Sequence, residues 1–281
     1  MFQYAVLRAI QLRTGFTSKV DIALFEKYGL HQGFEIKKIF SQAPISIASS
    51  ADVNGILGWR SRFGLSKIFI RPDLDLLRPS NFIVEPNLQF QKQVLNIGDD
   101  SYLCGYWQSE KYFFDVRDQI RKDLIFSQLI DDVNKEYEKQ IASTNSISLH
   151  IRRGDYVANP ASLAIHGVCS IDYYKLAIAH IEKNISSPIY FIFSDDMPWA
   201  RSNFGFLNSA VFIDHNKNDK SYIDMQLMSY CKHHIIANSS FSWWGAWLNN
   251  NPGKIVISPK RWFADTSKLS QDLIPDSWIK L

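Results

Sequence analysis

The pattern of apolar and polar positions divides the chain into two parts. Residues 1–13 place apolar side chains at helical spacing and are followed by Gly15, which predicts an amphipathic helix. The apolar spacing of residues 113–130 predicts another helix. Residues 131–145 are polar and charged, so we place a domain boundary there.

After this boundary, strand patterns alternate with helical patterns. Residues 146–151 alternate as a strand does, and the continuous apolar run 189–193 is typical of a strand buried on both faces. Further strands are predicted at 211–213, 234–237 and 255–257. Helices are predicted to start at Ser170, at Ser221 and after Ser239. The alternation predicts a parallel α/β sheet, whose ligands bind beyond the carboxyl ends of the strands.

Composition narrows the class of protein. The 281 residues are 46% hydrophobic, which suits one or two domains with ordinary cores and excludes disorder. The net charge of +3 is too small for a protein that mainly binds nucleic acid. Three widely spaced cysteines argue against a disulfide scaffold and indicate a reducing compartment. No leader and no apolar run of about 20 residues is present, so no membrane span is predicted.

The first candidate cluster follows the strand 146–151. His150 and Arg152 share a strand face, and Arg153, Gly154 and Asp155 come next. Adjacent guanidiniums suit a bidentate pyrophosphate or carboxylate, and Gly154 would let the backbone turn. The alternative is an ion pair of Arg152 or Arg153 with Asp155.

Two further clusters end the later strands. Asp195 and Asp196 follow the run 189–193. A carboxylate at this strand end can accept hydrogen bonds from a base or a sugar, or hold a metal. The alternative is that it caps the next helix. The segment 238–245, NSSFSWWG, offers hydroxyls and free N–H groups at a helix start, which is an anion site without a cation. Its alternative is capping by Ser239 or Ser240, with Trp243 and Trp244 in the core.

Metal sites have weaker support. Asp73 and Asp75 have the DxD spacing that could hold a divalent cation, but a solvated, charge-paired loop is the favoured interpretation of this segment. The histidines show no HExxH pattern.

The clusters together carry a family resemblance. HIRRGDYV at 150–157, FSDD at 193–196 and IIANSSFSWWGAWL at 235–248 resemble, in this order, the motifs of the alpha-1,2-fucosyltransferases, glycosyltransferase family 11. MFQYAVLRA at 1–9, YLCGYWQSEKYF at 102–113 and IDYY at 171–174 are also similar to that family. The resemblance implies a GT-B-like α/β fold of two Rossmann-like lobes with the active site in the cleft between them.

The resemblance also implies a reaction. It implies inverting transfer of L-fucose from GDP-beta-L-fucose to the 2-hydroxyl of a terminal beta-galactoside, with no metal required. Arg152 and Arg153 match the arginines that embrace the donor pyrophosphate, and His150 and Asp195 match positions near the guanosine. The residues that match the loop facing the diphosphate are Ser239, Ser240 and Ser242. Without a metal, fixed cations and dipoles must stabilise the leaving group.

Other roles are assigned as hypotheses. Asp155 is the candidate base, and a substrate-assisted reaction without an enzymic base is its alternative. We expect an acceptor lobe at 1–145, a GDP-fucose-binding lobe at 146–260, and a segment 261–281 that packs back across the lobes. Family members have a strand and a GGLGNQ loop before MFQYA, so the first lobe is expected to lack both.

Competing functions are a non-catalytic sugar-nucleotide or glycan-binding homologue and a metal-dependent enzyme using Asp73 and Asp75. The expected location is the cytoplasm, at the inner face of the membrane where lipid-linked acceptors lie.

Overall fold

The computed structural model describes residues 1–25, 33–61, 70–71, 78–129 and 131–281, in two compact units. The first unit is Met1–Ile125 with Leu269–Pro275, and the second is Phe126–Lys268 with Asp276–Leu281. The boundary expected after residue 145 is therefore wrong. Helix α6 (Asp132–Ser143) looked like a linker because its exposed face is polar, but its buried Ile141 joins a core cluster of the second unit. The expected third segment, 261–281, is divided between both units.

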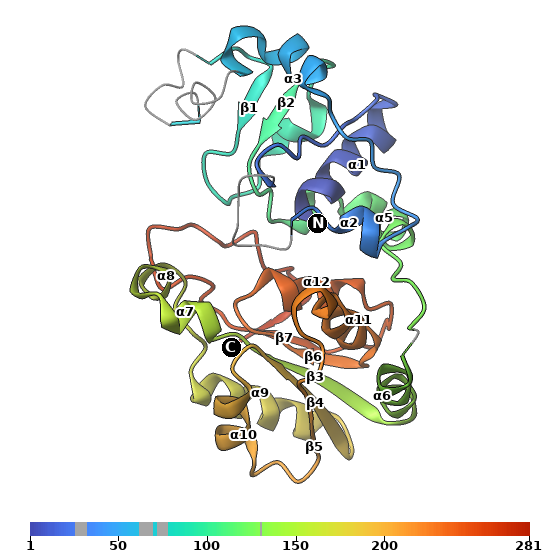
Figure 1. Ribbon diagram of the computed structural model, residues 1–281. Coiled ribbons are helices and arrows are strands. Elements are labelled where there is room, and N and C mark those ends of the chain that lie inside the picture. The colour runs from blue at the N-terminus through green and yellow to red at the C-terminus, as the bar shows by residue number, and fades with distance from the viewer. Residues whose placement is uncertain (26–32, 62–69, 72–77, 130) are drawn as a thin grey trace. The chain divides into compact units, whose positions relative to one another are not determined.

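The first unit begins with α1 (Phe2–Thr14), as predicted. Gly15 ends it in the left-handed region at φ 76°, and its N–H donates to the carbonyl of Gln11. The unit also has a parallel pair of strands, β1 and β2 (Figure 1). These strands are β1 (Phe82–Val84) and β2 (Tyr102–Cys104). The α-helices described in this unit besides α1 are α2 (Ile36–Ile39), α3 (Ser50–Leu57) and α5 (Arg117–Asp123).

The helix expected over residues 113–130 is much shorter. A 3₁₀ turn, Phe114–Val116, leads into α5, which ends at Asp123. The apolar spacing is real, since Phe113, Ile120 and Leu124 are buried. That spacing cannot separate a 3₁₀ turn followed by a short helix from one long helix, because i, i+3 neighbours share a face in both.

The second unit is built on a parallel sheet in the order β5-β4-β3-β6-β7-β8. Every predicted strand is present, and the edge strand β8 was not predicted. The strands are β3 (Asn145–Ile151), β4 (Pro188–Ser194), β5 (Ala210–Ile213), β6 (His233–Ile235), β7 (Val256–Ser258) and β8 (Ile279–Lys280). The helices are α6, α7 (Gly154–Ala158), α8 (Pro160–His166), α9 (Ile171–Asn184), α10 (Met197–Phe204), α11 (Tyr222–Tyr230) and α12 (Ser240–Leu248).

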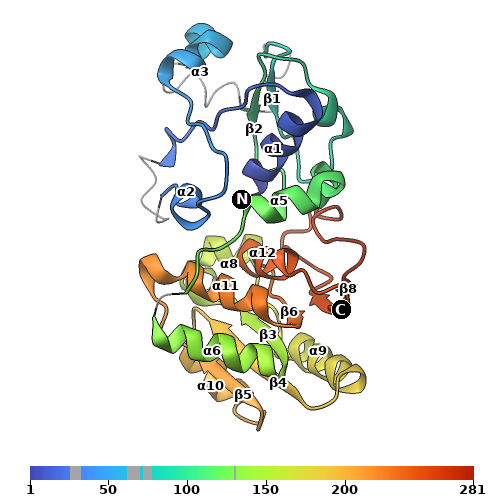
Figure 2. The ribbon, with the colours of Figure 1, turned by 90° about the vertical axis from the view of Figure 1, so that its right-hand side faces the viewer.

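Helices cover both faces of this sheet, as a parallel sheet requires. On β4, Tyr190 and Ile192 belong to the core cluster with α9 and α10, whereas Phe191 and Phe193 belong to the cluster with α6 and α11. The ribbon shows the same layers (Figures 1 and 2). Ser170 caps α9 as predicted, its hydroxyl accepting from the N–H of Tyr173 at 3.2 Å.

Strand β3 is buried on both faces, although its sequence alternates. Its polar positions Ser146, Ser148 and His150 are all buried. The Ser148 hydroxyl lies 2.8 Å from Nδ1 of His234 on the neighbouring strand β6. The polar face of β3 is therefore an internal layer, in which Ser146 and Ser148 are hydrogen-bonded.

Candidate anion-binding site at the strand ends

The predicted site residues follow three adjacent strands of the second unit. Strands β4 and β6 flank β3 in parallel register, so the segments after all three lie at one edge of the sheet. These segments are α7, the turn before α10, and the start of α12. The sequence prediction that the clusters meet at the carboxyl ends of the strands is thereby confirmed.

Arg152 is held by two carboxylates. Its guanidinium contacts Oδ1 of Asp155 at 2.7 Å and Oδ2 of Asp195 at 3.0 Å. It also lies over the ring of Tyr156, 5.3 Å from its centroid. The ion pair with Asp155, which the sequence left as an alternative, is therefore present.

Arg153 differs from Arg152 in which nitrogens of its guanidinium are hydrogen-bonded. Nε donates to Oδ2 of Asp196 at 3.3 Å, and Cζ lies 4.1 Å from the ring centroid of Trp199. Its two terminal nitrogens, Nη1 and Nη2, donate to no group in the part of the chain that the structure describes. Asp196 therefore orients the guanidinium through Nε, while Nη1 and Nη2 have no partner among the described residues. Two such parallel donors can bind a phosphate in bidentate fashion.

The two aspartates have separate roles. Asp196 caps α10, accepting from the N–H of Trp199 at 3.2 Å, and also holds Arg153. Asp195 accepts from the N–H of Arg153 at 2.8 Å and pairs with Arg152. Capping thus applies to Asp196, while Asp195 fixes both arginines.

Glycine is required at position 154 because the side chain of Asp195 lies where a Cβ atom would be, and not because of the backbone conformation. A Cβ at this position would lie 2.8 Å from Oδ2 and 3.0 Å from Cγ of Asp195. The expectation that Gly154 allows an unusual backbone turn is wrong, because it starts the helix α7 and its φ is not positive. It lets Asp195 approach the arginines closely.

His150 lies beneath this edge. It is 5% exposed, its ring is 5.8 Å from that of Phe241 on α12, and its Nδ1 has no hydrogen-bond partner among the described residues. Burial lowers the pKa of His150 to about 3, against the opposing effect of Asp195. The imidazole is therefore neutral at physiological pH.

The serine segment is mostly engaged in local structure. Ser239 accepts from the N–H of Phe241 at 3.3 Å, and Ser242 donates to the carbonyl of Ser239 at 3.3 Å. Both are buried, as are Trp243 and Trp244, which confirms the capping and core interpretations. Ser240 is exposed at the N-terminus of α12. Of the three predicted serines, it is the one that is exposed, since Ser239 and Ser242 are buried.

Sequence reasoning missed a buried polar network beyond β5. The amides of Asn134 and Asn216 bond each other at 2.9 and 3.0 Å, and Nδ2 of Asn216 also donates to Asp224 at 2.8 Å. Burial raises the pKa of Asp224 to about 7. The signal was available in the sequence: Asp214, His215 and Asn216 directly follow a predicted strand.

Sequence reasoning also missed Tyr156 and Trp199 as supports of the arginines. Tyr156 follows Arg152 by four residues, and this nearness in the chain was the available signal. Trp199 lies over Arg153, which is 46 residues earlier in the chain, so no local spacing could have identified that contact.

The metal hypothesis rests on Asp73 and Asp75, which lie outside the described residues. Within the described residues, no group of three or more histidine, cysteine or acidic side chains could hold a metal ion. No helix in the described part of the chain is long and apolar enough to cross a membrane.

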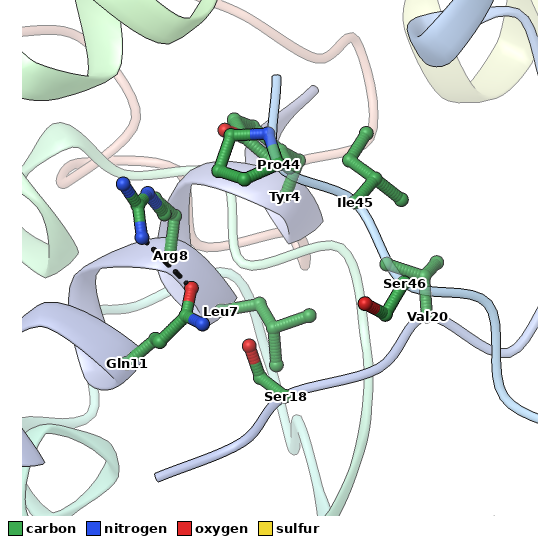
Figure 3. A pocket seen from close by; sticks show the side chains of 9 residues that line it. All are labelled: Tyr4, Leu7, Arg8, Gln11, Ser18, Val20, Pro44, Ile45 and Ser46. Atoms are coloured by element: carbon green, nitrogen blue, oxygen red, sulfur yellow. Dashed lines mark hydrogen bonds between the residues drawn. The ribbon is translucent and has the colours of Figure 1, made fainter. Parts of the chain in front are cut away.

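The first unit has a small pocket beside α1 (Figure 3). Its volume of about 10 Å³ has room for one water molecule and not for a sugar. Arg8, which lines it, donates to Gln11 at 2.9 Å and to the buried Asp123 at 2.8 Å. The bond to Asp123 stabilises the packing of α1 on α5, whereas the bond to Gln11 lies within α1.

Comparison with known proteins decides the family. The model of glycosyl transferase family 11 matches residues 80–281. The Alpha-1,2-colitosyltransferase of Escherichia coli is 32% identical over 302 residues, covering 100% of this chain and 94% of that protein. The chain belongs to glycosyl transferase family 11.

Other relatives of this family 11 chain match over shorter regions. The O-antigen biosynthesis glycosyltransferase WbnK of Escherichia coli is 42% identical over 66% of the chain and 63% of that protein. Galactoside alpha-(1,2)-fucosyltransferase 2 of Mus musculus is 24% identical over 62% of the chain and 48% of that protein.

The crystal structure of fucosyltransferase NodZ from Bradyrhizobium has a similar fold. Its TM-score is 0.50 at 14% identity, over 90% of this chain and 91% of that one. The predicted GT-B-like α/β fold of this family 11 glycosyltransferase is confirmed.

Proposed function

We propose that this family 11 enzyme transfers L-fucose from GDP-beta-L-fucose to the 2-hydroxyl of a terminal beta-galactoside, with inversion. The observation that carries the proposal is the guanidinium fork of Arg153, whose Nη1 and Nη2 have no partner in the described part of the chain, beside Arg152 at the carboxyl ends of the strands. The names of the mammalian relatives, galactoside alpha-(1,2)-fucosyltransferases, support the linkage and the acceptor. Action at the cytoplasmic face on membrane-borne acceptors remains part of this proposal.

The reaction proposed is a single displacement. The acceptor oxygen forms a bond to the anomeric carbon while the bond from that carbon to the β-phosphate oxygen breaks, and the electron pair leaves with GDP. Arg153 stabilises the charge that develops on the diphosphate, helped by N–H groups at the start of α12. Asp155, which is 62% exposed and bonded to Arg152, is the candidate that accepts the acceptor's proton.

A second donor is favoured by one observation. One relative, which aligns with the whole chain, is named an alpha-1,2-colitosyltransferase. Colitose is fucose without its 3-hydroxyl group, so GDP-colitose would present the same diphosphate to Arg153. The second candidate is therefore colitosyl transfer by the same residues.

The direct test measures GDP release and product linkage with each donor and with lactose as acceptor. We expect acceptor-dependent GDP release and an alpha-1,2 product by NMR, with unchanged rates in EDTA. Binding of GDP without turnover would establish the non-catalytic homologue instead. Loss of activity in EDTA would contradict the metal-independent mechanism and favour the metal-dependent one.

The close approach at Gly154 gives a structural test of the site. Gly154→Ala places a methyl group against Asp195 and must displace its carboxylate from Arg152. We expect roughly tenfold weaker GDP binding by calorimetry, the loss of about one charge-assisted hydrogen bond. Gly253→Ala is the matched control, because the nearest atom to its Cβ would be 3.6 Å away. Equal GDP affinities for the two variants would contradict a role for the Asp195–Arg152 pair.

A further inference from the structure

A second set of strand ends, in the first unit, carries an unusual loop. Strands β1 and β2 are parallel, so Glu85, directly after β1, and Gly105–Trp107, directly after β2, lie at the same edge. The carboxylate of Glu85 accepts from the N–H of Tyr106 at 2.6 Å and from that of Trp107 at 2.9 Å. One side chain thus binds two successive backbone groups of the loop.

The loop is held in a strained conformation. Trp107 has φ 55°, in the left-handed region that a bulky side chain rarely adopts. Its indole is 2% exposed and meets the ring of Tyr112 edge-on, with centroids 5.8 Å apart. A Cβ at Gly105 would overlap the Cβ of Glu85, so only glycine fits there. Such strain persists where the surroundings impose it, and it concentrates at functional sites.

The consequence of this geometry is the position of Tyr106. It lies between the constrained Gly105 and the buried Trp107, yet its own side chain is 68% exposed. It makes no ring contact or side-chain hydrogen bond with any residue that the structure describes. The carbonyl of Gly105 is further fixed by the side-chain amide of Gln3 at 2.6 Å. These contacts hold the backbone of the loop in place, and the loop exposes the ring of Tyr106 to solvent.

We propose that Tyr106 is the platform on which a pyranose ring of the acceptor glycan stacks, and that Glu85 is the positioning residue that holds it there. The inference rests on the proposed function and names residues that recognise its acceptor. The electron-rich face of an aromatic ring suits the C–H face of a pyranose, and the phenol hydroxyl can bond a sugar hydroxyl. A platform fixed in advance also loses little entropy on binding.

The experiment measures glycan and nucleotide binding separately. Affinities of the full-length wild type and of Tyr106→Ala, Tyr106→Phe, Glu85→Gln and Phe114→Ala are determined by NMR titration with lactose and with Gal-β1,3-GlcNAc, and by calorimetry with GDP. We expect Tyr106→Ala to weaken glycan binding about tenfold and Tyr106→Phe to retain most of it. Glu85→Gln replaces one of the two accepting oxygens by an NH2 group, which cannot accept a backbone N–H, so it is expected to weaken glycan binding severalfold. Phe114→Ala removes an aromatic side chain of the same unit that is 50% exposed and should change neither affinity.

Steady-state kinetics separate positioning from general damage to the fold. In Tyr106→Ala and Glu85→Gln, the KM for the acceptor should rise while the KM for the donor stays unchanged. The melting temperature should stay unchanged in Tyr106→Ala, because this side chain is exposed, and should fall in Glu85→Gln, which loses a hydrogen bond of the loop. Wild type that binds neither glycan, or Tyr106→Ala that binds them normally, overturns the inference. A matching loss of GDP affinity in Tyr106→Ala would reassign the platform to the nucleotide and overturn it as well. If the wild type binds glycan and GDP-fucose but forms no product, the role of Tyr106 in glycan binding is still supported and the proposed transfer is contradicted.

Discussion

Arg153→Ala is expected to lower the rate of transfer about 100- to 1,000-fold, the usual cost of removing one preorganised donor to a developing anion. Among the described residues, Nη1 and Nη2 of Arg153 have no partner, whereas both terminal nitrogens of Arg152 already bind carboxylates, those of Asp155 and Asp195. The effect should fall on kcat more than on the KM for the donor if the fork binds the leaving diphosphate most strongly in the transition state.

Two further variants make this prediction specific. Arg153→Lys keeps the charge but removes the planar fork, so it should recover only part of the rate. Arg201→Ala is the matched control: Arg201 also combines an ion pair, to Asp214 at 2.7 Å, with an aromatic contact, to Phe212 at 4.8 Å. Its removal should leave the rate unchanged. Wild-type turnover in Arg153→Ala would refute the proposed site, and equal losses in Arg201→Ala would show that the effect comes from stability.

The second unit was predictable because its signals are local. A continuous apolar run such as 189–193 is typical of a strand buried on both faces, and Ser170 caps the helix that begins at Ile171. Parallel order then places the polar clusters at one sheet edge without any knowledge of contacts. The positions of the arginines and Asp195 follow from this rule.

Pairings between distant segments could not be predicted in the same way. Spacing suggested that Arg153 could pair with Asp155, but it pairs with Asp196, which only the register of β3 with β4 brings near. Likewise, the polar surface of α6 suggested a linker, because a sequence does not show that a single apolar stripe packs on α11. These contacts depend on tertiary packing, which overrides local pattern.

The loop at residues 105–107 shows a different limit. Its motif was noticed only through the family resemblance. Nothing in the amino-acid sequence indicates that Trp107 has a positive φ or that the N–H of Trp107 donates to Glu85. Gly105 was the one available hint, since a glycine next to a strand end can mark a close backbone approach. The approach is to Glu85, from a segment about 20 residues earlier in the chain.

His150 should make the second unit lose stability as the medium becomes acidic. Its folded pKa of about 3 lies below the ordinary value of 6.5, so the unfolded chain binds more protons between these values. The stability that depends on neutral His150 is complete above pH 6.5 and is lost progressively as the pH falls toward 3. Between pH 7.5 and pH 5.0 this single group should lower the free energy of unfolding by about 2 kcal/mol.

The comparison of wild type with His150→Phe isolates this contribution, because other titrating groups, such as the buried His234, are common to both proteins. Urea unfolding is followed by tryptophan fluorescence, which reports mainly on the second unit: of the 8 tryptophans, all but Trp59 and Trp107 lie there. The stability of wild type relative to His150→Phe should fall by about 2 kcal/mol from pH 7.5 to pH 5.0. His150→Leu, which also cannot titrate, should reproduce the pH dependence of His150→Phe even if its packing costs differ. A difference between wild type and variant that stays constant over this range would mean that the imidazole accepts a proton in the folded state, and that His150 is not held neutral beneath the arginines.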